Sequence, residues 1–306
     1  MIQFLKNIFH EYVGAYQEPT MQSISTKVKD LEINSKRLSN HLFTGEYHSA
    51  FKGRGMAFKE VKEYSAGDDI RFIDWNVSAR MGNTYSKVFE EERELSVYIL
   101  VDASASNYFG SAQQSKRALM NEIAAVLAFS AINNNDKVGL LFYADTVEKY
   151  IPSAKGREHV LYMVRELVTF TAAAKQTNLV KALQYLNRIS RQKSIVFILS
   201  DFADDGYQNA LRVAAKKHDV IGVQVYDKLD TTLPNIGLLQ IEDAETGIPY
   251  LIDTTNAQTQ QAYIQQHQSI IQDAAVIFKK ASASLIQIQT NTDFVKALQQ
   301  FFIKRI

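Results

Sequence analysis

The feature that most constrains the fold is a regular alternation of short apolar segments and longer amphipathic segments from residue 96 onward. The short segments are rich in β-branched residues, which is typical of buried strands. They cover residues 96–101, 137–145, 194–201, 219–227 and 285–290. The longer segments have a helical period and cover residues 114–133, 156–170, 177–189, 207–218, 259–282 and 293–304. This alternation predicts an α/β domain with an open, mostly parallel sheet flanked by helices.

Two smaller features belong to the same part of the chain. Residues 147–153 are predicted to pair with the preceding strand as a short edge strand. Residues 238–254 are predicted to form a hairpin, with its turn at Ala244 to Gly247. We find no internal repeat that would indicate a solenoid or a propeller.

Polar side chains follow the first apolar segment at once. Asp102, Ser104 and Ser106 occupy alternate positions directly after residues 96–101. The carboxyl ends of parallel strands border the crevice in which α/β sheets bind ligands. One carboxylate and two hydroxyls are hard oxygen donors, which suit a cation such as Mg²⁺ and leave positions for water. The alternative is that these residues only cap a helix or shape a turn.

Two distant residues extend this candidate site. Thr177 begins an amphipathic segment, and Asp201 ends the apolar segment 194–201. Two strand ends and one helix start therefore each offer an oxygen ligand. Because the carboxyl ends of parallel strands lie at one edge of the sheet, we expect these residues to converge.

The order and setting of these five residues resemble the metal-ion-dependent adhesion site (MIDAS) of von Willebrand factor A domains. The resemblance implies a von Willebrand factor A or Rossmann-like fold for the α/β part. It also implies that Asp102, Ser104, Ser106, Thr177 and Asp201 hold a divalent cation, Mg²⁺ or else Mn²⁺ or Ca²⁺, some of them through water. In such domains an acidic residue of a protein partner supplies the last ligand, so the implied activity is binding and not catalysis.

A second signature precedes the α/β part. Residues 53–94 contain Tyr64, Gly67, Asp68, Asp69, Ile70, Arg71, Ile73, Asp74 and Trp75, followed by Ser78, Ala79 and Arg80. This block strongly resembles the DUF58 family, and the similarity runs from about Leu31 to the C-terminus. Such proteins are typically linked with MoxR-type AAA+ ATPases. The resemblance implies a bacterial adaptor or chaperone-like protein whose partner is such an ATPase or its client.

The two signatures predict two domains. Residues 1–94 form a helical lead-in and the DUF58 block, with a helix and short strands, and residues 95–306 form the von Willebrand factor A-like domain. Acids and arginines alternate in the block, which indicates local ion pairing. We expect Trp75 to pack among apolar neighbours, and the alternative is a docking surface anchored by Trp75 or an Arg. The candidate partner-binding or structural residues are Gly67, Asp68, Arg71, Asp74 and Trp75.

The composition excludes several classes of protein. The 306 residues include no cysteine, which excludes disulfides, thiol catalysis and cysteine-ligated metals. The 34 basic and 33 acidic residues nearly balance, so there is no electrostatic case for a nucleic-acid partner. No apolar run is long enough for a transmembrane helix, and we expect a cytoplasmic protein. Residues 1–16 are predicted to form an amphipathic helix, which packs on its own protein or touches a partner or a membrane peripherally.

Two alternatives to a binding module remain. A Mg²⁺-dependent hydrolase would act at the same strand edge. Phosphoryl transfer through an aspartyl nucleophile usually needs a second acid two residues on, and here that position is Ser104. The other alternative is a scaffold with a vestigial metal site. Because the resemblance implies binding and the hydrolase alternative lacks its second acid, we expect a protein that is not an enzyme.

Overall fold

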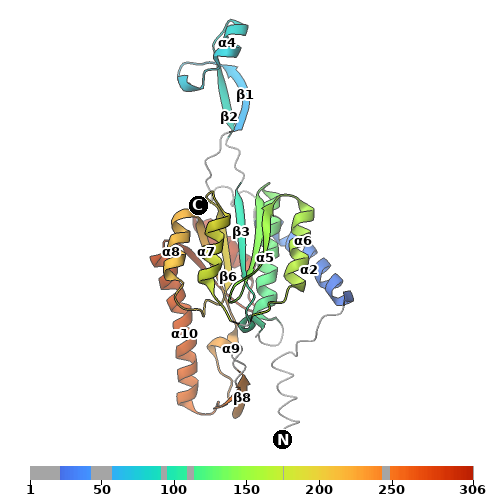
Figure 1. The fold of residues 1–306 in the computed structure, drawn as a ribbon, viewed down its shortest axis with the longest axis vertical. Coiled ribbons are helices and arrows are strands. Elements are labelled where there is room, and N and C mark those ends of the chain that lie inside the picture. Colours follow the sequence, from blue (N-terminus) through green and yellow to red (C-terminus); the bar gives the residue numbers. More distant parts are fainter. Residues whose placement is uncertain are drawn as a thin grey trace. The chain divides into compact units, whose positions relative to one another are not determined.

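The computed structural model describes residues 21–42, 57–90, 95–108, 114–174, 176–242 and 249–305 (Figure 1). The chain forms two compact units. The larger unit comprises Met1–Ala50 together with Ser96–Ile306, and the smaller unit is Phe51–Leu95. The smaller unit is therefore inserted, in sequence, into the larger one.

A six-stranded sheet forms the centre of the larger unit. Its strands are β3 (Ser96–Asp102), β4 (Lys137–Tyr143), β5 (Val147–Ala154), β6 (Ile195–Ser200), β7 (Asp219–Tyr226) and β10 (Ser284–Gln289). They lie in the order β10-β7-β6-β3-β4-β5. Every neighbouring pair is parallel except β4 and β5, which are antiparallel. The structure thus confirms the predicted mostly parallel sheet and the predicted edge strand, which pairs antiparallel with β4.

Helices cover both faces of this sheet. On one face lie α7 (Leu179–Ile189), α8 (Gln208–Lys217) and α10 (Ala257–Lys280), whose apolar side chains join one core cluster. On the other face lie α5 (Lys116–Asn133) and α11 (Phe294–Arg305). The helix α6 (Arg157–Thr169) packs against α5. All these helices fall within two residues of the predicted segments.

The central strand β3 shows why the sheet needs two layers of helices. Every residue of β3 after Ser96 is buried. Because side chains alternate along a strand, Tyr98 and Leu100 join the cluster of α7 and α8, and Val97 and Ile99 point to the α5 face. A parallel strand that is buried on both faces has a continuous apolar sequence, as this one does.

A close approach between α10 and the sheet depends on one glycine. Gly222 lies in β7, and a Cβ at this position would be 2.5 Å from the ring of Phe278. Phe278 is fully buried and forms an edge-on contact with Phe202, with the ring centroids 5.0 Å apart. The missing side chain at Gly222 therefore makes room for an aromatic anchor of the longest helix.

The helix α2 (Met21–Leu42) packs on α5 and α6 and so belongs to the larger unit. The Asn133 amide of α5 donates to Ser39 Oγ at 3.2 Å, and Arg157 of α6 pairs with Glu32 at 2.7 Å. The predicted boundary grouped this helix with the DUF58 block, as residues 1–94. The structure differs because α2 makes these contacts with the α/β core.

The smaller unit is a two-stranded antiparallel sheet with two short helical turns. It contains β1 (Ala57–Glu63), a 3₁₀ turn η1 (Ile70–Phe72), α4 (Trp75–Met81) and β2 (Tyr85–Glu90). The carboxylate of Asp74 caps α4 by accepting from the N–H groups of Asn76 and Val77. Gly82 ends the helix with a left-handed φ of 79°, a conformation that suits glycine.

The predicted hairpin consists of β8 (Leu238–Glu242) and β9 (Pro249–Asp253), which pair antiparallel. Its predicted turn lies outside the described residues, as does the amphipathic helix predicted for residues 1–16. A short helix α9 (Lys228–Thr231) follows β7. Among the described residues, no helix combines the length and the apolar character that a membrane crossing requires.

Candidate metal site at the carboxyl edge of the sheet

Asp102 is the last residue of β3, and its carboxylate is completely buried. Its Oδ1 accepts from the Ser104 N–H at 2.9 Å, and its Oδ2 accepts from the Ser200 hydroxyl at 2.7 Å. The guanidinium of Arg117 donates to the Asp102 carbonyl at 3.2 Å. Burial and the nearby negative charge of Asp201 raise the pKa of Asp102 to about 6. A carboxylate in this state would be stabilised by a nearby cation.

Ser104 and Ser106 follow in the loop. Ser104 is buried, and its Oγ accepts from the Asn107 amide at 3.0 Å. Ser106 lies in the 3₁₀ turn η2 (Ala105–Tyr108), and its side chain is outside the described part of the structure. Ser104 therefore lies beside Asp102.

Asp201 follows β6 directly, and β6 is the neighbour of β3 in the sheet. Its Oδ1 accepts from the Ala203 N–H at 3.2 Å, and its backbone carbonyl accepts from the Gln224 amide at 3.0 Å. The negative charge of Asp201 disfavours ionisation of Asp102 and contributes to the raised pKa of Asp102. The structure thus brings the two predicted aspartates to the same edge from positions far apart in the sequence.

The residue next to Thr177, Asn178, makes contacts that place the Thr177 loop at this edge of the sheet. The helix α7 begins two residues after Thr177, at Leu179, because the Asn178 side chain caps it by accepting from the Lys181 N–H at 3.1 Å. The Asn178 N–H donates to the carbonyl of Ala144, which follows β4 directly, at 2.8 Å. This contact ties the Thr177 loop to the end of the strand beside β3.

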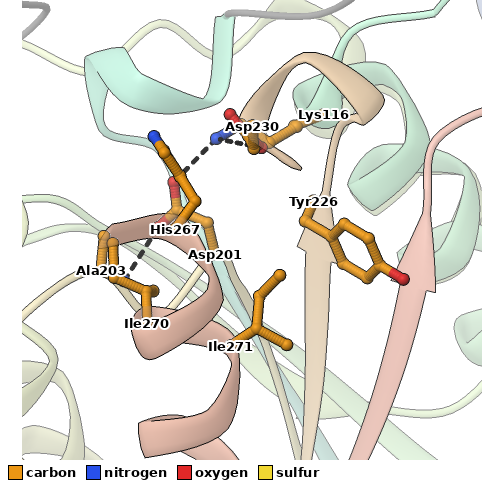
Figure 2. Close-up of a pocket in the computed structure, with 8 residues that line it drawn as sticks. All are labelled: Lys116, Asp201, Ala203, Tyr226, Asp230, His267, Ile270 and Ile271. Atoms are coloured by element: carbon orange, nitrogen blue, oxygen red, sulfur yellow. Dashed lines mark hydrogen bonds and ion pairs between the residues drawn. The ribbon is translucent and has the colours of Figure 1, made fainter. Parts of the chain in front are cut away.

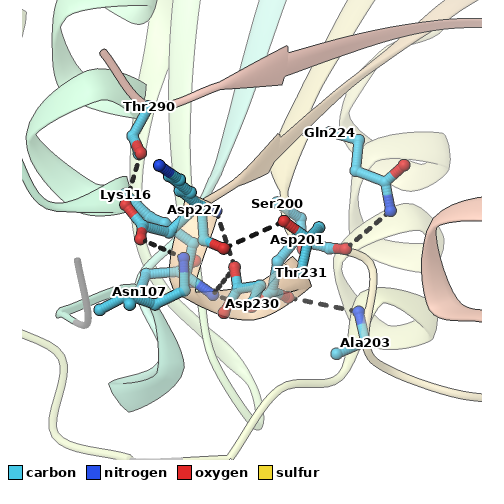
Figure 3. A network of polar contacts seen from close by, with 12 residues as sticks. Asn107, Lys116, Ser200, Asp201, Ala203, Gln224, Asp227, Asp230, Thr231 and Thr290 are labelled. Carbon is cyan, nitrogen blue, oxygen red and sulfur yellow. Dashed lines mark hydrogen bonds and ion pairs between the residues drawn. The ribbon is translucent and has the colours of Figure 1, made fainter. Parts of the chain in front are cut away.

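The chain leaves β3 and β6 toward opposite faces of the sheet, since α5 and α8 lie on different faces. Such a switch in direction opens a crevice outside the strand ends, which is the usual ligand site of open α/β sheets. A polar network at this edge joins residues at the ends of β6 and β7, in α9 and beyond β10 (Figure 3). The Ser200 hydroxyl extends it to Asp102 at the end of β3. Asp201 lines a pocket at this edge together with Lys116 and Asp230, and Asp102 is fully buried.

Lys116, Asp230 and Ser200 are part of this edge and were missed from the sequence. The ammonium of Lys116 lies 3.0 Å from Asp201 Oδ2 and 3.6 Å from Asp230 Oδ2. Ser200 directly precedes Asp201, and this position could have suggested its role. Lys116 begins a helix of ordinary sequence, and Asp230 lies in the four-residue helix α9, which is too short to show a period, so neither carried a sequence signal.

The donor set suits a hard divalent cation. It offers carboxylate and hydroxyl oxygens, the ligand types that Mg²⁺ prefers. Within the described ranges, no group of three acidic, histidine or cysteine side chains is arranged to hold a metal. A set with two carboxylates would depend on hydroxyls, water and an outside ligand. The described donors are of the types that such a cation prefers, and the ammonium of Lys116 lies against one of them.

The block residues lie in the smaller unit. Asp68 pairs with Lys62 at 2.8 Å, Asp69 with Arg71 at 2.6 Å, and Asp74 with Lys87 at 3.5 Å. Local ion pairing is therefore present, although two of the three partners are strand lysines. Gly67 has a φ of 112°, which strains any other residue.

The expectation that Trp75 packs is wrong, because 70% of Trp75 is exposed. Ile70 and Met81 are exposed to a similar degree. Trp75 is the first residue of the two-turn helix α4, and α4 has no buried residue. Two short strands offer too little surface to bury so large a side chain.

The fold defines a class, namely an α/β domain with an open, mostly parallel sheet flanked by helices. The chain belongs to the DUF58 family, since the family model described as "Protein of unknown function DUF58" matches residues 60–271. It is 28% identical to the uncharacterized protein Rv1480 of Mycobacterium tuberculosis over 287 residues, which cover 92% of this chain and 90% of the relative. It is 29% identical to the uncharacterized protein YeaD of Bacillus subtilis over 108 residues, 35% of this chain and 25% of that protein.

Several solved structures are similar to part of the chain. An aerotolerance-related membrane protein from Bacteroides fragilis matches with a TM-score of 0.48 and 18% identity, over 69% of this chain and 99% of that chain. The conserved hypothetical protein BatB from Bacteroides thetaiotaomicron matches with a TM-score of 0.46 and 17% identity, over 69% and 98% of the two chains. The SpRpn10 VWA domain matches with a TM-score of 0.36 and 12% identity, over 67% and 94%.

Proposed function

We propose that the protein is a metal-dependent protein-binding module. The von Willebrand factor A-like fold favours a protein-interaction role. In the proposal, Asp102, Ser104, Ser106, Thr177 and Asp201 hold Mg²⁺, or Mn²⁺ or Ca²⁺ in its place. The cation would supply a positive centre for a carboxylate of the partner.

One observation carries this proposal. Asp102 and Asp201 come from separate strand ends, and the charge of Asp201 helps to raise the pKa of the buried Asp102. Two carboxylates that oppose each other's ionisation favour the binding of a cation between them. Ser200 and the Ser104 N–H hold the Asp102 carboxylate in one orientation, so the site loses little entropy on binding.

The partner in this proposal is a MoxR-type AAA+ ATPase or its client, and the protein acts as an adaptor or chaperone-like factor. Membership of the DUF58 family supports this choice through the association that the family resemblance implies. The partner's contribution is an acidic side chain that approaches the crevice between the ends of β3 and β6.

Cation binding is tested first, on the full chain. Titration of wild type with MnCl₂ or MgCl₂ is followed by calorimetry, and thermal unfolding is recorded with each cation and with EDTA. We expect the cation to raise the melting temperature of wild type, because a ligand that binds only the folded state stabilises it. Asp102→Ala removes this gain. Asp205→Ala, at an exposed acid near Asp201, serves as the matched control and keeps it.

Partner binding is tested next, with a purified MoxR-type ATPase from the same organism. We expect retention by wild type in Mg²⁺, and loss in EDTA or with Asp102→Ala. Equal retention in all four conditions would mean that the site is a scaffold feature. Turnover of a phosphoester that Asp102→Ala abolishes would instead establish a hydrolase.

A further inference from the structure

Lys116 is the unexpected residue of the candidate site. It is only 5% exposed, and its ammonium lies between Asp201 and Asp230 (Figure 2). The contact with Asp201 is the shorter of the two, at 3.0 Å against 3.6 Å. Asp201 is also one of the five candidate ligands of the cation. The site therefore already holds a positive charge of its own on one of its ligands.

Lys116 occupies an unfavourable place for a lysine. It is the first residue of α5, where the helix dipole is positive and disfavours a cation. Burial of its ammonium alone would lower the pKa of Lys116, but the charges of Asp201 and Asp230 raise it, so the group stays protonated. Both costs are offset by nearby carboxylates, chiefly Asp201 and Asp230, which links the presence of this charge to the site.

Asp230 is a fixed second partner. Its Oδ2 accepts from the Asp227 N–H at 2.8 Å, and the two residues form the capping box of α9. The Asp227 carboxylate in turn accepts from the hydroxyl of Thr290, beyond β10. Because these contacts fix the Asp230 carboxylate, Asp230 can still pair with the Lys116 ammonium when Asp201 binds a metal cation.

We propose that Lys116 is a built-in competitor of the divalent cation at this edge. When no metal is bound, the Lys116 ammonium pairs with Asp201. When a metal binds Asp201, the ammonium pairs with Asp230 alone. Lys116 thereby lowers the cation affinity of the free protein, and Asp230 limits that loss. The inference rests on the proposed function, and it assigns to this chain a residue that sets how strongly its site binds a cation.

The test is Mn²⁺ titration of full-length variants by calorimetry. Lys116→Met keeps the length of the side chain and removes its charge. We expect it to bind Mn²⁺ at least about tenfold more tightly than wild type, because a close like charge has gone. Asp230→Asn keeps an oxygen for the Asp227 N–H but removes the second anchor of the ammonium. We expect it to bind Mn²⁺ more weakly than wild type.

The matched control is Lys181→Met. Lys181 pairs with Asp145 at 3.1 Å, and both side chains are 45% exposed. Asp145 lies just after β4, so this change also removes one charge near the same sheet edge. We expect its Mn²⁺ affinity to stay within about threefold of wild type, because solvent screens an exposed pair.

The outcomes separate this inference from the proposed function. Tighter binding by Lys116→Met, abolished when Asp102→Ala is added, supports both. Equal or weaker binding by Lys116→Met, with Asp102→Ala still abolishing it, overturns the inference and leaves the proposed function standing. No binding by any variant overturns both. If Lys116→Met does not fold, the test depends on Asp230→Asn. In that case, binding of Mn²⁺ by Asp230→Asn as tightly as by wild type, or more tightly, overturns the inference.

Discussion

At the scale of single residues, burial decides what a charged or titratable side chain does. Asp102 and Lys116 are both buried near Asp201, and their pKa values rise for opposite reasons. The pKa of Asp102 rises because burial and a like charge disfavour its ionised form. That of Lys116 rises because opposite charges outweigh its burial. The same small region thus holds one carboxyl that resists ionisation and one ammonium that keeps its proton.

His218 gives a pH-dependent prediction away from the site. It is 2% exposed, and burial and then the charge of Lys217 lower its pKa from 6.5 to about 4. The unfolded chain binds this proton more readily, so the stability that neutral His218 contributes is present above pH 6.5. We expect it to be lost as the pH falls from 6.5 toward 4, by on the order of 3 kcal/mol.

Urea unfolding at several pH values measures this loss, with His218→Leu as the comparison. The variant lacks the titrating group, so its stability should fall less over the same window. Parallel curves for the two proteins would show that His218 does not carry the effect.

At the scale of elements, the strands and helices were predictable because each has a clear period. Fully apolar strands such as β3 and β6 and amphipathic helices such as α7 carry that signal in their own residues. The site was predictable only in part. Asp102 and Asp201 lie at strand ends, whose position follows from the topology. Lys116 and Asp230 depend on how α5 and α9 pack in three dimensions, which local sequence does not encode.

The packing of α10 against the sheet gives a second prediction. In Gly222→Ala, the added methyl meets the Phe278 ring, and we expect a loss of about 1–3 kcal/mol in unfolding free energy. Phe278→Leu alone also destabilises, because it removes a buried ring. The double variant should lose less than the sum of the two, since the smaller side chain leaves room for the methyl. Urea denaturation of all four proteins checks this, and strict additivity would contradict it.

The start of α7 gives a third prediction. Asn178→Ala removes the side chain that accepts from the Lys181 N–H, and we expect a loss of about 1 kcal/mol. Asn178→Asp keeps an accepting oxygen and should be close to wild type. If both substitutions cost the same, the cap is not the source of the effect. Thermal unfolding in EDTA measures the cap separately from any cation binding at Thr177.

At the scale of the whole molecule, the two units differ in how they are stabilised. The larger unit buries a double-sided sheet under helices, with nearly all of β3, β4 and β6 inaccessible to solvent. The smaller unit is stabilised by surface ion pairs, helix caps and one short ladder, and it exposes Ile70, Trp75 and Met81. Exposed ion pairs contribute little to stability. We therefore expect the smaller unit to be the less stable of the two.

Trp75 makes this difference measurable, because it is the only tryptophan of the chain. With 70% of its surface exposed, its native fluorescence should already be that of a hydrated indole. We expect the emission maximum to change little as urea unfolds the protein, while circular dichroism shows a cooperative loss of the helices. A large red shift that coincides with the loss of helix would show that Trp75 is covered in solution.

The pairing of Ala57 with Glu90 brings the two ends of the smaller unit's sheet together. Chain segments whose ends meet can be inserted into a host domain, or removed from it, with little effect on the host's topology. The smaller unit is thus a cassette within a continuous α/β scaffold. Evolution could lengthen, replace or discard it without rebuilding the sheet, and an engineer could exchange it for another hairpin.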